Sequence, residues 1–199
     1  MAGAETRGGW IVGLVMGAAL LGSGYAVAVE TGTPITIGLL VIDQAGVPPN
    51  VLIRAKQEAT RIYDGIGITL VWLDMGAIGV GHRRTIKIVT HALAGRGIAS
   101  SALGVAAGTT ETRGTMAYAF YQRIQDTAHV IGTNTGMLLG HVIAHEIGHL
   151  LLPYNAHGTT GLMRGSWDTE QAVRASRGLL TFTTQEADLI RQRLVRHDD

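Results

Sequence analysis

The segment from Gly140 to Arg164 constrains the fold of this chain more than any other part of the sequence. It reads GHVIAHEIGHLLLPYNAHGTTGLMR, and apolar residues fill most positions between Met137 and Leu152. A helix that is apolar nearly all round is buried in a core, so the segment predicts a central helix. Pro153 ends this helix, because proline cannot continue its backbone hydrogen bonding.

The predicted helix carries an H-E-x-x-H motif at His145, Glu146 and His149. Residues four apart lie on one helical face, so the two imidazoles can bind the same metal ion. Zinc is the metal that this motif favours, and Glu146 would lie near the open coordination position, where it can accept a proton from water. Charged residues are rarely buried without a partner, which favours a metal site over two ordinary histidines and a glutamate. We therefore expect one zinc ion (Zn2+) per chain.

A catalytic zinc site needs a third protein ligand and keeps water in the fourth position. His157 is the leading possibility, because it follows the end of the helix in a loop that can fold back toward the metal. Asp168 and Glu170 remain alternatives, since a carboxylate from further along the chain can also complete a zinc site. His141 lies one turn before the motif, but three histidines spread over about 12 Å of helix cannot share one ion. We expect His141 to be packed or hydrogen-bonded.

These residues resemble the metzincin clan of zinc endopeptidases, whose pattern is H-E-x-x-H-x-x-G-x-x-H followed by a turn that carries a methionine beneath the metal. The chain departs from the pattern in two places, because Leu152 stands at the glycine position and Asn155 at the strict position of the third histidine. An isolated methionine is also a common core residue. The resemblance covers about Gly140–Met163 and is carried by His145, Glu146, His149, His157 as third ligand and Met163 as the structural methionine of the turn.

The resemblance implies a zinc-dependent endopeptidase that hydrolyses peptide bonds by zinc-activated water with Glu146 as general base. A tyrosine or an arginine often holds the oxyanion in such sites. The residues available for substrate binding of this kind, which the sequence does not rank, are Tyr118, Tyr121, Tyr154 and Arg164. The resemblance also makes Met116–Tyr121 the edge strand that pairs with an extended substrate, although an ordinary sheet strand is an equal alternative.

Two other functions stay open. The chain can be a non-catalytic extracytoplasmic binding module with a structural zinc site, in which a fourth protein ligand such as Asp168 closes the metal. It can also be a zinc hydrolase in which Glu170, rather than His157, is the third ligand.

The N-terminus has the pattern of a targeting segment. Arg7 precedes the uncharged stretch Trp10–Leu21, and Ala26–Ala28 offers a small-x-small cleavage site. We expect residues 1–28 to be a cleaved signal peptide and residues 29–199 to be the zincin-like metallopeptidase domain. The alternative is an uncleaved membrane anchor, because Trp10–Val29 is long enough to span a bilayer. Both alternatives give a secreted or extracytoplasmic protein, and the absence of cysteine agrees with this location and excludes thiolate ligands.

The composition of the chain limits the kinds of partner that it is expected to bind. The formal net charge is +1, basic residues are scattered and aromatic residues are few, which argues against nucleic acid. Protein or peptide substrates are the expected partners, and a membrane becomes a partner only if the N-terminal segment stays uncleaved. The sequence does not predict an oligomeric state.

The remaining elements place the central helix in a fold. Apolar runs predict strands at Ile35–Asp43, Ile68–Leu73, Thr85–Thr90 and Met116–Tyr121. A helix follows the first strand, a last helix begins at a capping box in Thr183–Glu186, and the small polar stretch Ala94–Gly114 is expected to be a long loop. We therefore expect an α/β (α+β zincin-like) fold in a single domain. It would have a four- to five-stranded mixed twisted sheet, a backing helix, a central active-site helix and a C-terminal helix.

Overall fold

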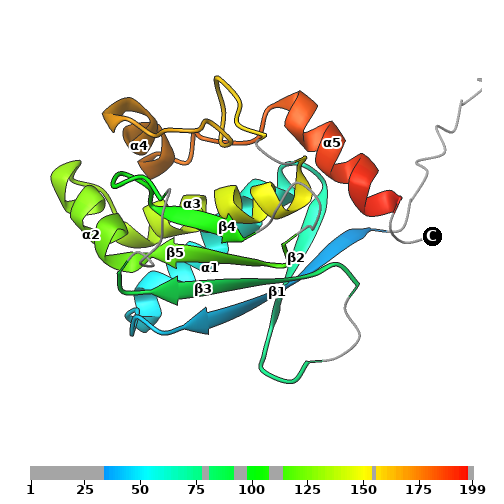
Figure 1. Cartoon of the computed structure of the whole chain (residues 1–199), viewed down its shortest axis with the longest axis horizontal. Helices are drawn as coiled ribbons and strands as arrows, with labels where there is room; N and C mark the ends of the chain where they lie inside the picture. Colours follow the sequence, from blue (N-terminus) through cyan, green and yellow to red (C-terminus); the bar gives the residue numbers. More distant parts are fainter. Residues whose placement is uncertain (1–33, 78–80, 92–97, 108–113, 154–155, 197–199) are drawn as a thin grey trace, which may run out of the picture. The chain divides into compact units, whose positions relative to one another are not determined.

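The architecture is that of a computed structural model of the chain (Figure 1). The structure describes residues 34–77, 81–91, 98–107, 114–153 and 156–196, which all belong to the unit Thr33–Asp199. The expected signal peptide, residues 1–28, and Tyr154 lie outside the described residues. Within the described part of the chain, no helix combines the length and apolar character needed to cross a membrane.

Five strands of the described chain form one mixed sheet in the order β2-β1-β3-β5-β4. They are β1 (Ile35–Asp43), β2 (Ile68–Leu73), β3 (Arg83–Val89), β4 (Gly104–Ala107) and β5 (Met116–Phe120). The strands β1, β2, β3 and β5 run parallel, and β4 is antiparallel to β5. The expected single α/β domain with a mixed sheet is confirmed.

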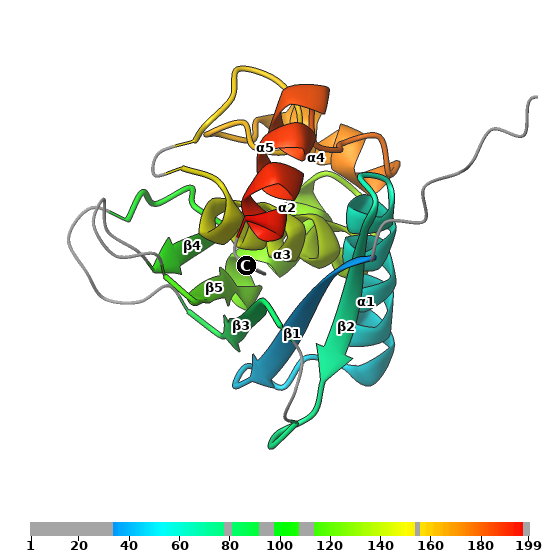
Figure 2. The same ribbon diagram turned by 90° about the vertical axis from the view of Figure 1, so that its right-hand side faces the viewer.

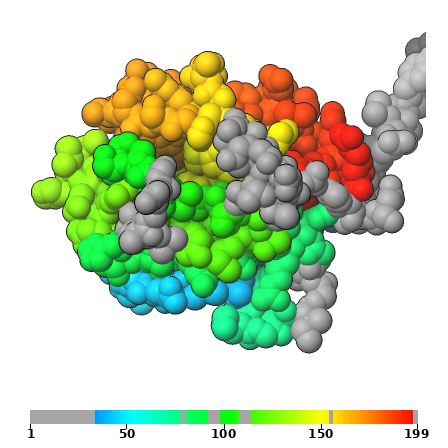
Figure 3. Space-filling model, in the orientation of Figure 1, coloured from blue at the N-terminus to red at the C-terminus, as the bar shows by residue number. Residues whose placement is uncertain are grey.

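The described residues also form five helices: α1 (Pro49–Asp64), α2 (Tyr121–Val130), α3 (Thr135–Leu151), α4 (Thr169–Ser176) and α5 (Thr184–Val195). Figure 2 shows α1 and α3 beside the sheet, with α4 and α5 beyond α3. In the space-filling view, the orange and red C-terminal segments form the upper part of the face, above the green strands (Figure 3). The helix α3 is buried along nearly its whole length, because it contacts the sheet and each of the other four helices.

Local sequence signals fix the ends of the central and last helices. The side chain of Asn134 accepts a hydrogen bond from the Met137 N–H at 3.0 Å and so caps α3. The helix ends at Leu151, two residues before the proline that cannot continue it. At the start of α5, Thr183 and Glu186 form the expected capping box.

The structure differs from the sequence prediction around the segment 94–121. Gly104–Ala107 forms strand β4 inside the stretch expected to be a loop. The sequence does not predict this strand, because its small residues give no alternating apolar pattern. The prediction that Met116–Tyr121 is the edge strand is wrong, since β4 pairs with β5 and occupies the edge of the described sheet. Tyr121 begins α2, a helix that the sequence patterns did not predict.

Candidate metal centre

Three imidazole rings converge at the C-terminal half of α3. The helix supplies His145 and His149, and the loop after it supplies His157. The Nε2 atom of His149 lies 3.0 Å from that of His145 and 3.1 Å from that of His157. One ligand atom from each ring fits within 4.8 Å of the others. Nitrogens bound tetrahedrally to zinc at about 2.0–2.1 Å lie about 3.3 Å apart, so the cluster has the dimensions of a metal site.

The backbone orients the first of these rings. The Nδ1 atom of His145 lies 2.7 Å from the carbonyl oxygen of Leu162. A carbonyl can only accept, so Nδ1 carries the proton and the Nε2 lone pair is left for a metal. Burial, with a contribution from the neighbouring histidines, lowers the pKa of His145 to about 4 and that of His149 to about 3. Both rings are therefore neutral at neutral pH, which is the form that binds metals.

Glu146 is a buried carboxylate beside this cluster. Its side chain is 5% exposed, and its Oε2 atom has no hydrogen-bond partner among the described residues. Burial raises the pKa of Glu146 to about 8. Ionising a carboxylate in such surroundings becomes favourable when a cation lies close by. The unpartnered oxygen of Glu146 and the three imidazole rings together fit a divalent metal ion.

Gly104 brings the edge strand against this carboxylate. A Cβ atom added to Gly104 would lie 2.6 Å from Oε1 of Glu146 and 2.7 Å from the carbonyl oxygen of Tyr118. A larger residue at this position cannot be accommodated without moving β4 or Glu146. Sequence reasoning missed this contact, because nothing distinguishes Gly104 among 28 glycines.

Met163 packs against α3 at Gly148. It is fully buried, and a Cβ atom added to Gly148 would lie 2.5 Å from its Sδ atom. The turn around it is held by backbone hydrogen bonds, from the Gly158 N–H to the Met163 carbonyl at 2.9 Å and from the Leu162 N–H to the Thr181 carbonyl at 2.8 Å. The same turn therefore carries both the methionine and the carbonyl that orients His145.

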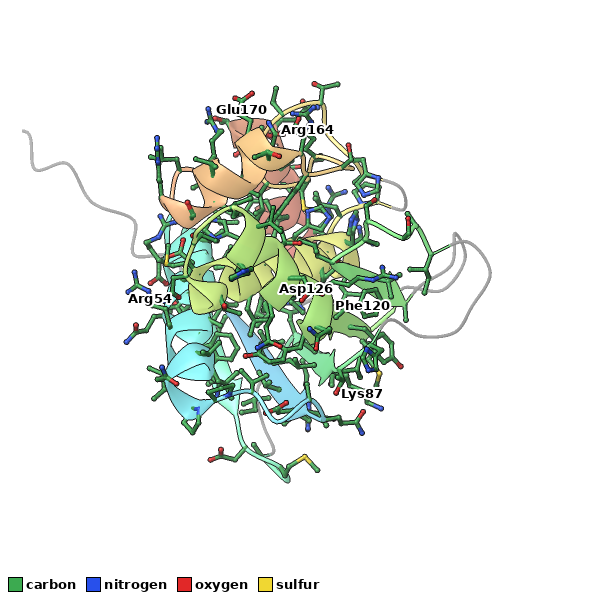
Figure 4. All side chains as sticks on the ribbon, turned by 90° about the vertical axis from the view of Figure 1, so that its left-hand side faces the viewer. Arg54, Lys87, Phe120, Asp126, Arg164 and Glu170 are labelled. Atoms are coloured by element: carbon green, nitrogen blue, oxygen red, sulfur yellow. The ribbon has the colours of Figure 1, made fainter. Side chains whose placement is uncertain are left out.

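The two alternative third ligands lie elsewhere. Asp168 caps α4, with Oδ1 accepting from the Glu170 N–H at 2.8 Å and Oδ2 lying 3.5 Å from Nη2 of Arg164. Figure 4 shows Arg164 and Glu170 together at the α4 end, across the molecule from Lys87 of the sheet. Among the described residues, the group that could hold a metal ion consists of His145, His149 and His157 alone.

Among the described residues, no hydrogen bond or ring contact joins Tyr118 or Tyr121 to the three histidines. Ala117 and Ala119 of β5 are buried in the core beneath the helices, so Tyr118 between them points to the opposite face of the sheet. The pKa of Tyr121 is raised by burial and then by the negative charge of Asp43, which ends β1. Arg164 lies on the turn after Met163, where it pairs with Asp168.

His141 lies on α3 one turn before the cluster and is fully buried. Its Nδ1 atom lies 3.0 Å from the Met137 carbonyl, and its Nε2 atom lies 3.4 Å from Oε1 of Glu58 on α1. Burial lowers the pKa of His141. The expectation that His141 is packed or hydrogen-bonded is confirmed.

The fold and the histidine cluster define a single α/β domain with a candidate metal centre on its central helix. No family model matches the sequence, and no curated protein matches it. Among solved structures, the chain is similar to an archaemetzincin from Methanopyrus kandleri. The TM-score is 0.54 and the sequence identity is 17%, over 84% of this chain and 99% of that chain. This likeness shows the fold.

Proposed function

We propose that this protein is a zinc-dependent endopeptidase in which His145, His149 and His157 hold one zinc ion and Glu146 is the general base. The observation that carries the proposal is the convergence of three Nε2 atoms beside a buried carboxylate. The similarity in fold to an archaemetzincin supports it, because the motif of this chain resembles that of the metzincins.

The chain's own residues have separate roles in this reaction. Zinc bound by the three histidines would supply a Lewis acid that polarises a substrate carbonyl and lowers the pKa of water. Glu146 lies next to His145 on α3, where a cation favours its ionised form. It can then accept a proton from the attacking water and pass it to the leaving amine. The Leu162 carbonyl keeps His145 in the tautomer that binds metal.

The exposure of the cluster favours a catalytic site over a structural zinc site. His145 is 9% exposed, His149 is partly exposed and His157 lies at the surface, so the cluster opens toward solvent on the side of His157. Structural zinc sites are closed by four protein ligands, and the described residues supply three. The positions of Asp168 and Glu170 give no support to either as a ligand.

We infer that an extended peptide binds along the outer edge of β4. The Phe120 N–H donates to the Leu103 carbonyl at 2.8 Å, and the antiparallel register continues with Gly104 opposite Ala119. In such a ladder alternate residues turn their backbone groups outward, which here are Gly104 and Ala106. No described strand pairs with that side. A peptide added there would run beside Glu146.

A secreted or extracytoplasmic location is part of the proposal. The uncharged stretch Trp10–Leu21 and the small residues Ala26–Ala28 support removal of residues 1–28 during export. Mass spectrometry of the exported protein tests this inference. A chain that begins at Val29 supports it, and an intact N-terminus in a membrane fraction would show an anchor instead.

Cleavage of an unbiased peptide library tests the proposed activity. The purified protein with one equivalent of zinc should cleave internal peptide bonds. A chelator should abolish cleavage, and added zinc should restore it. Zinc binding without cleavage of any peptide would favour the non-catalytic binding module.

A further inference from the structure

The segment that leads into β4 has little apolar anchoring. Between residues 98 and 107 every side chain is exposed or half-buried, and the turn at 99–102 consists of alanine and serine. Leu103 and Ala106 pack against the hydrophobic core from half-buried positions, but no residue of the turn at 99–102 does so. Burial of apolar surface therefore contributes little to the position of this turn, and hydrogen bonds hold it close to the strand that borders Glu146.

Arg123 of α2 supplies such bonds. Its Nη1 atom donates to the carbonyl oxygens of Ala99 at 3.0 Å and Ala102 at 2.8 Å, which are also the two ends of a backbone turn. Hydrogen bonds from a guanidinium are stronger than those between neutral groups. The guanidinium lies over the ring of Phe120, 5.4 Å from its centroid, and Phe120 is fully buried. The side chain is thus held at its donor atom Nη1 and at the flat face of its guanidinium group.

The clamped turn ends two residues before Gly104. The Phe120 N–H donates to the Leu103 carbonyl at 2.8 Å, so the first rung of the β4–β5 ladder follows the clamp directly. At the next position the Gly104 backbone lies against Glu146 so closely that a Cβ atom would be 2.6 Å from Oε1. A displacement of the turn would therefore move the backbone that borders the carboxylate.

We propose that Arg123 is a positioning residue of the active site, which clamps the turn at 99–102 and so holds Gly104 of the edge strand against Glu146. Its effect on activity rests on the proposed peptidase function. Its effect on the position of β4 does not.

Hydrogen exchange tests the clamp without reference to catalysis. In the full-length protein, Arg123→Ala should accelerate amide exchange across residues 98–107 by at least about tenfold, because two charge-assisted hydrogen bonds are lost. Arg191→Ala is the matched control. Arg191 lies on α5 and also donates from Nη1 to a backbone carbonyl, that of Ile66, at 2.8 Å. The control should leave exchange in residues 98–107 unchanged. Equal exchange in Arg123→Ala and the unsubstituted protein would overturn the proposal.

Kinetics on a cleaved peptide test the consequence for the site. Arg123→Ala should lower kcat/KM by roughly tenfold to a hundredfold, because small displacements of reacting groups are costly. Zinc affinity should stay the same, and Arg123→Lys, which keeps a cationic donor, should recover part of the loss. Faster exchange in Arg123→Ala with an unchanged kcat/KM would overturn the positioning role. Absence of cleavage by the unsubstituted protein would contradict the proposed function instead, and the exchange result alone would then decide whether the clamp exists.

Discussion

At the scale of single residues, Glu146 most clearly sets this site apart from an ordinary buried helix. Its carboxylate is enclosed by α3 and by Gly104 of the edge strand, and burial raises the pKa of Glu146 to about 8. Without a cation nearby, burial therefore destabilises the ionised form of Glu146. In the proposed site, a metal ion held by the histidines would favour the ionised form and make Glu146 available as a base.

The destabilisation of the ionised Glu146 makes the free energy of unfolding of the metal-free protein depend on pH. A folded-state pKa above the unfolded value contributes stability that is present at low pH and is lost as the pH rises through the folded pKa, here about 8 for Glu146. The pKa values of His145 and His149, about 4 and 3, are lowered, so both rings are already neutral above pH ~6.5 in either state. We expect the free energy of unfolding to fall between pH ~6.5 and ~8, by up to about 1.4 kcal/mol per pH unit.

Urea unfolding in the presence of a chelator measures this loss. Glu146→Gln is the control, because a glutamine does not titrate and should show a smaller change over the same interval. An equal loss in both proteins would assign the effect to other groups and contradict the burial of an unpaired carboxylate.

At the scale of elements, α3 depends on glycines wherever a neighbour approaches closely. Cβ atoms added to Gly136 and Gly140 would lie 2.8 Å from the Val51 carbonyl and 2.7 Å from the Ala55 carbonyl of α1. A Cβ atom added to Gly148 would lie 2.5 Å from the Sδ atom of Met163, a residue outside α1 that packs against α3. The helix is thus fitted between α1 and the methionine turn, and the fit fixes where its histidines lie.

Gly148→Ala tests this fit. Alanine is a better helix former than glycine by about 1 kcal/mol, so a gain in stability would be the outcome without steric conflict. We expect a loss of about 1–3 kcal/mol instead, because the new methyl group would displace Met163. Zinc binding should also weaken, since the same turn carries the Leu162 carbonyl that orients His145.

Denaturant unfolding and zinc titration measure the two effects. Gly81→Ala is the control, because a Cβ atom there has nothing within 4 Å. A Gly148→Ala protein as stable as the unsubstituted chain would mean that Met163 does not pack against α3 as described.

The elements differ in how far the sequence predicts them. The strands β1 and β2 and the helices α3 and α5 follow from apolar runs, a proline stop and a capping box, which are local signals. Strand β4 does not, because its small residues owe their extended form to pairing with β5 and to the clamp by Arg123. The approach of Gly104 to Glu146 joins residues 42 positions apart, and no local pattern encodes such a contact.

At the scale of the whole molecule, the candidate metal centre combines residues of a buried helix with a residue of an exposed loop. The helix α3 lies in the core with His145 and His149, whereas His157 stands on an exposed loop beyond the helix. Zinc bound by all three would tie this loop to the core. Because a ligand that binds only the folded state stabilises it, zinc should raise the free energy of unfolding by about 4 kcal/mol at a thousandfold excess over Kd.

The stabilisation by zinc, measured in two variants, tests which residue is the third ligand. His157→Ala should lose most of the stabilisation by zinc, because one of three ligands is gone. Glu170→Ala should keep it, since Glu170 lies on the first turn of α4 and outside the histidine cluster. Thermal unfolding with and without zinc gives both values, and the reverse pattern would identify the glutamate as the ligand.

The central claim is that a zinc ion and Glu146 act together on a peptide bond. The most direct measurement compares kcat/KM of the unsubstituted protein and Glu146→Gln, each with one equivalent of bound zinc, on a peptide found in the library. We predict a fall of about 10²–10⁴-fold with zinc affinity retained, because the general base is lost and the metal ligands are not. Equal cleavage by the two proteins would contradict the account.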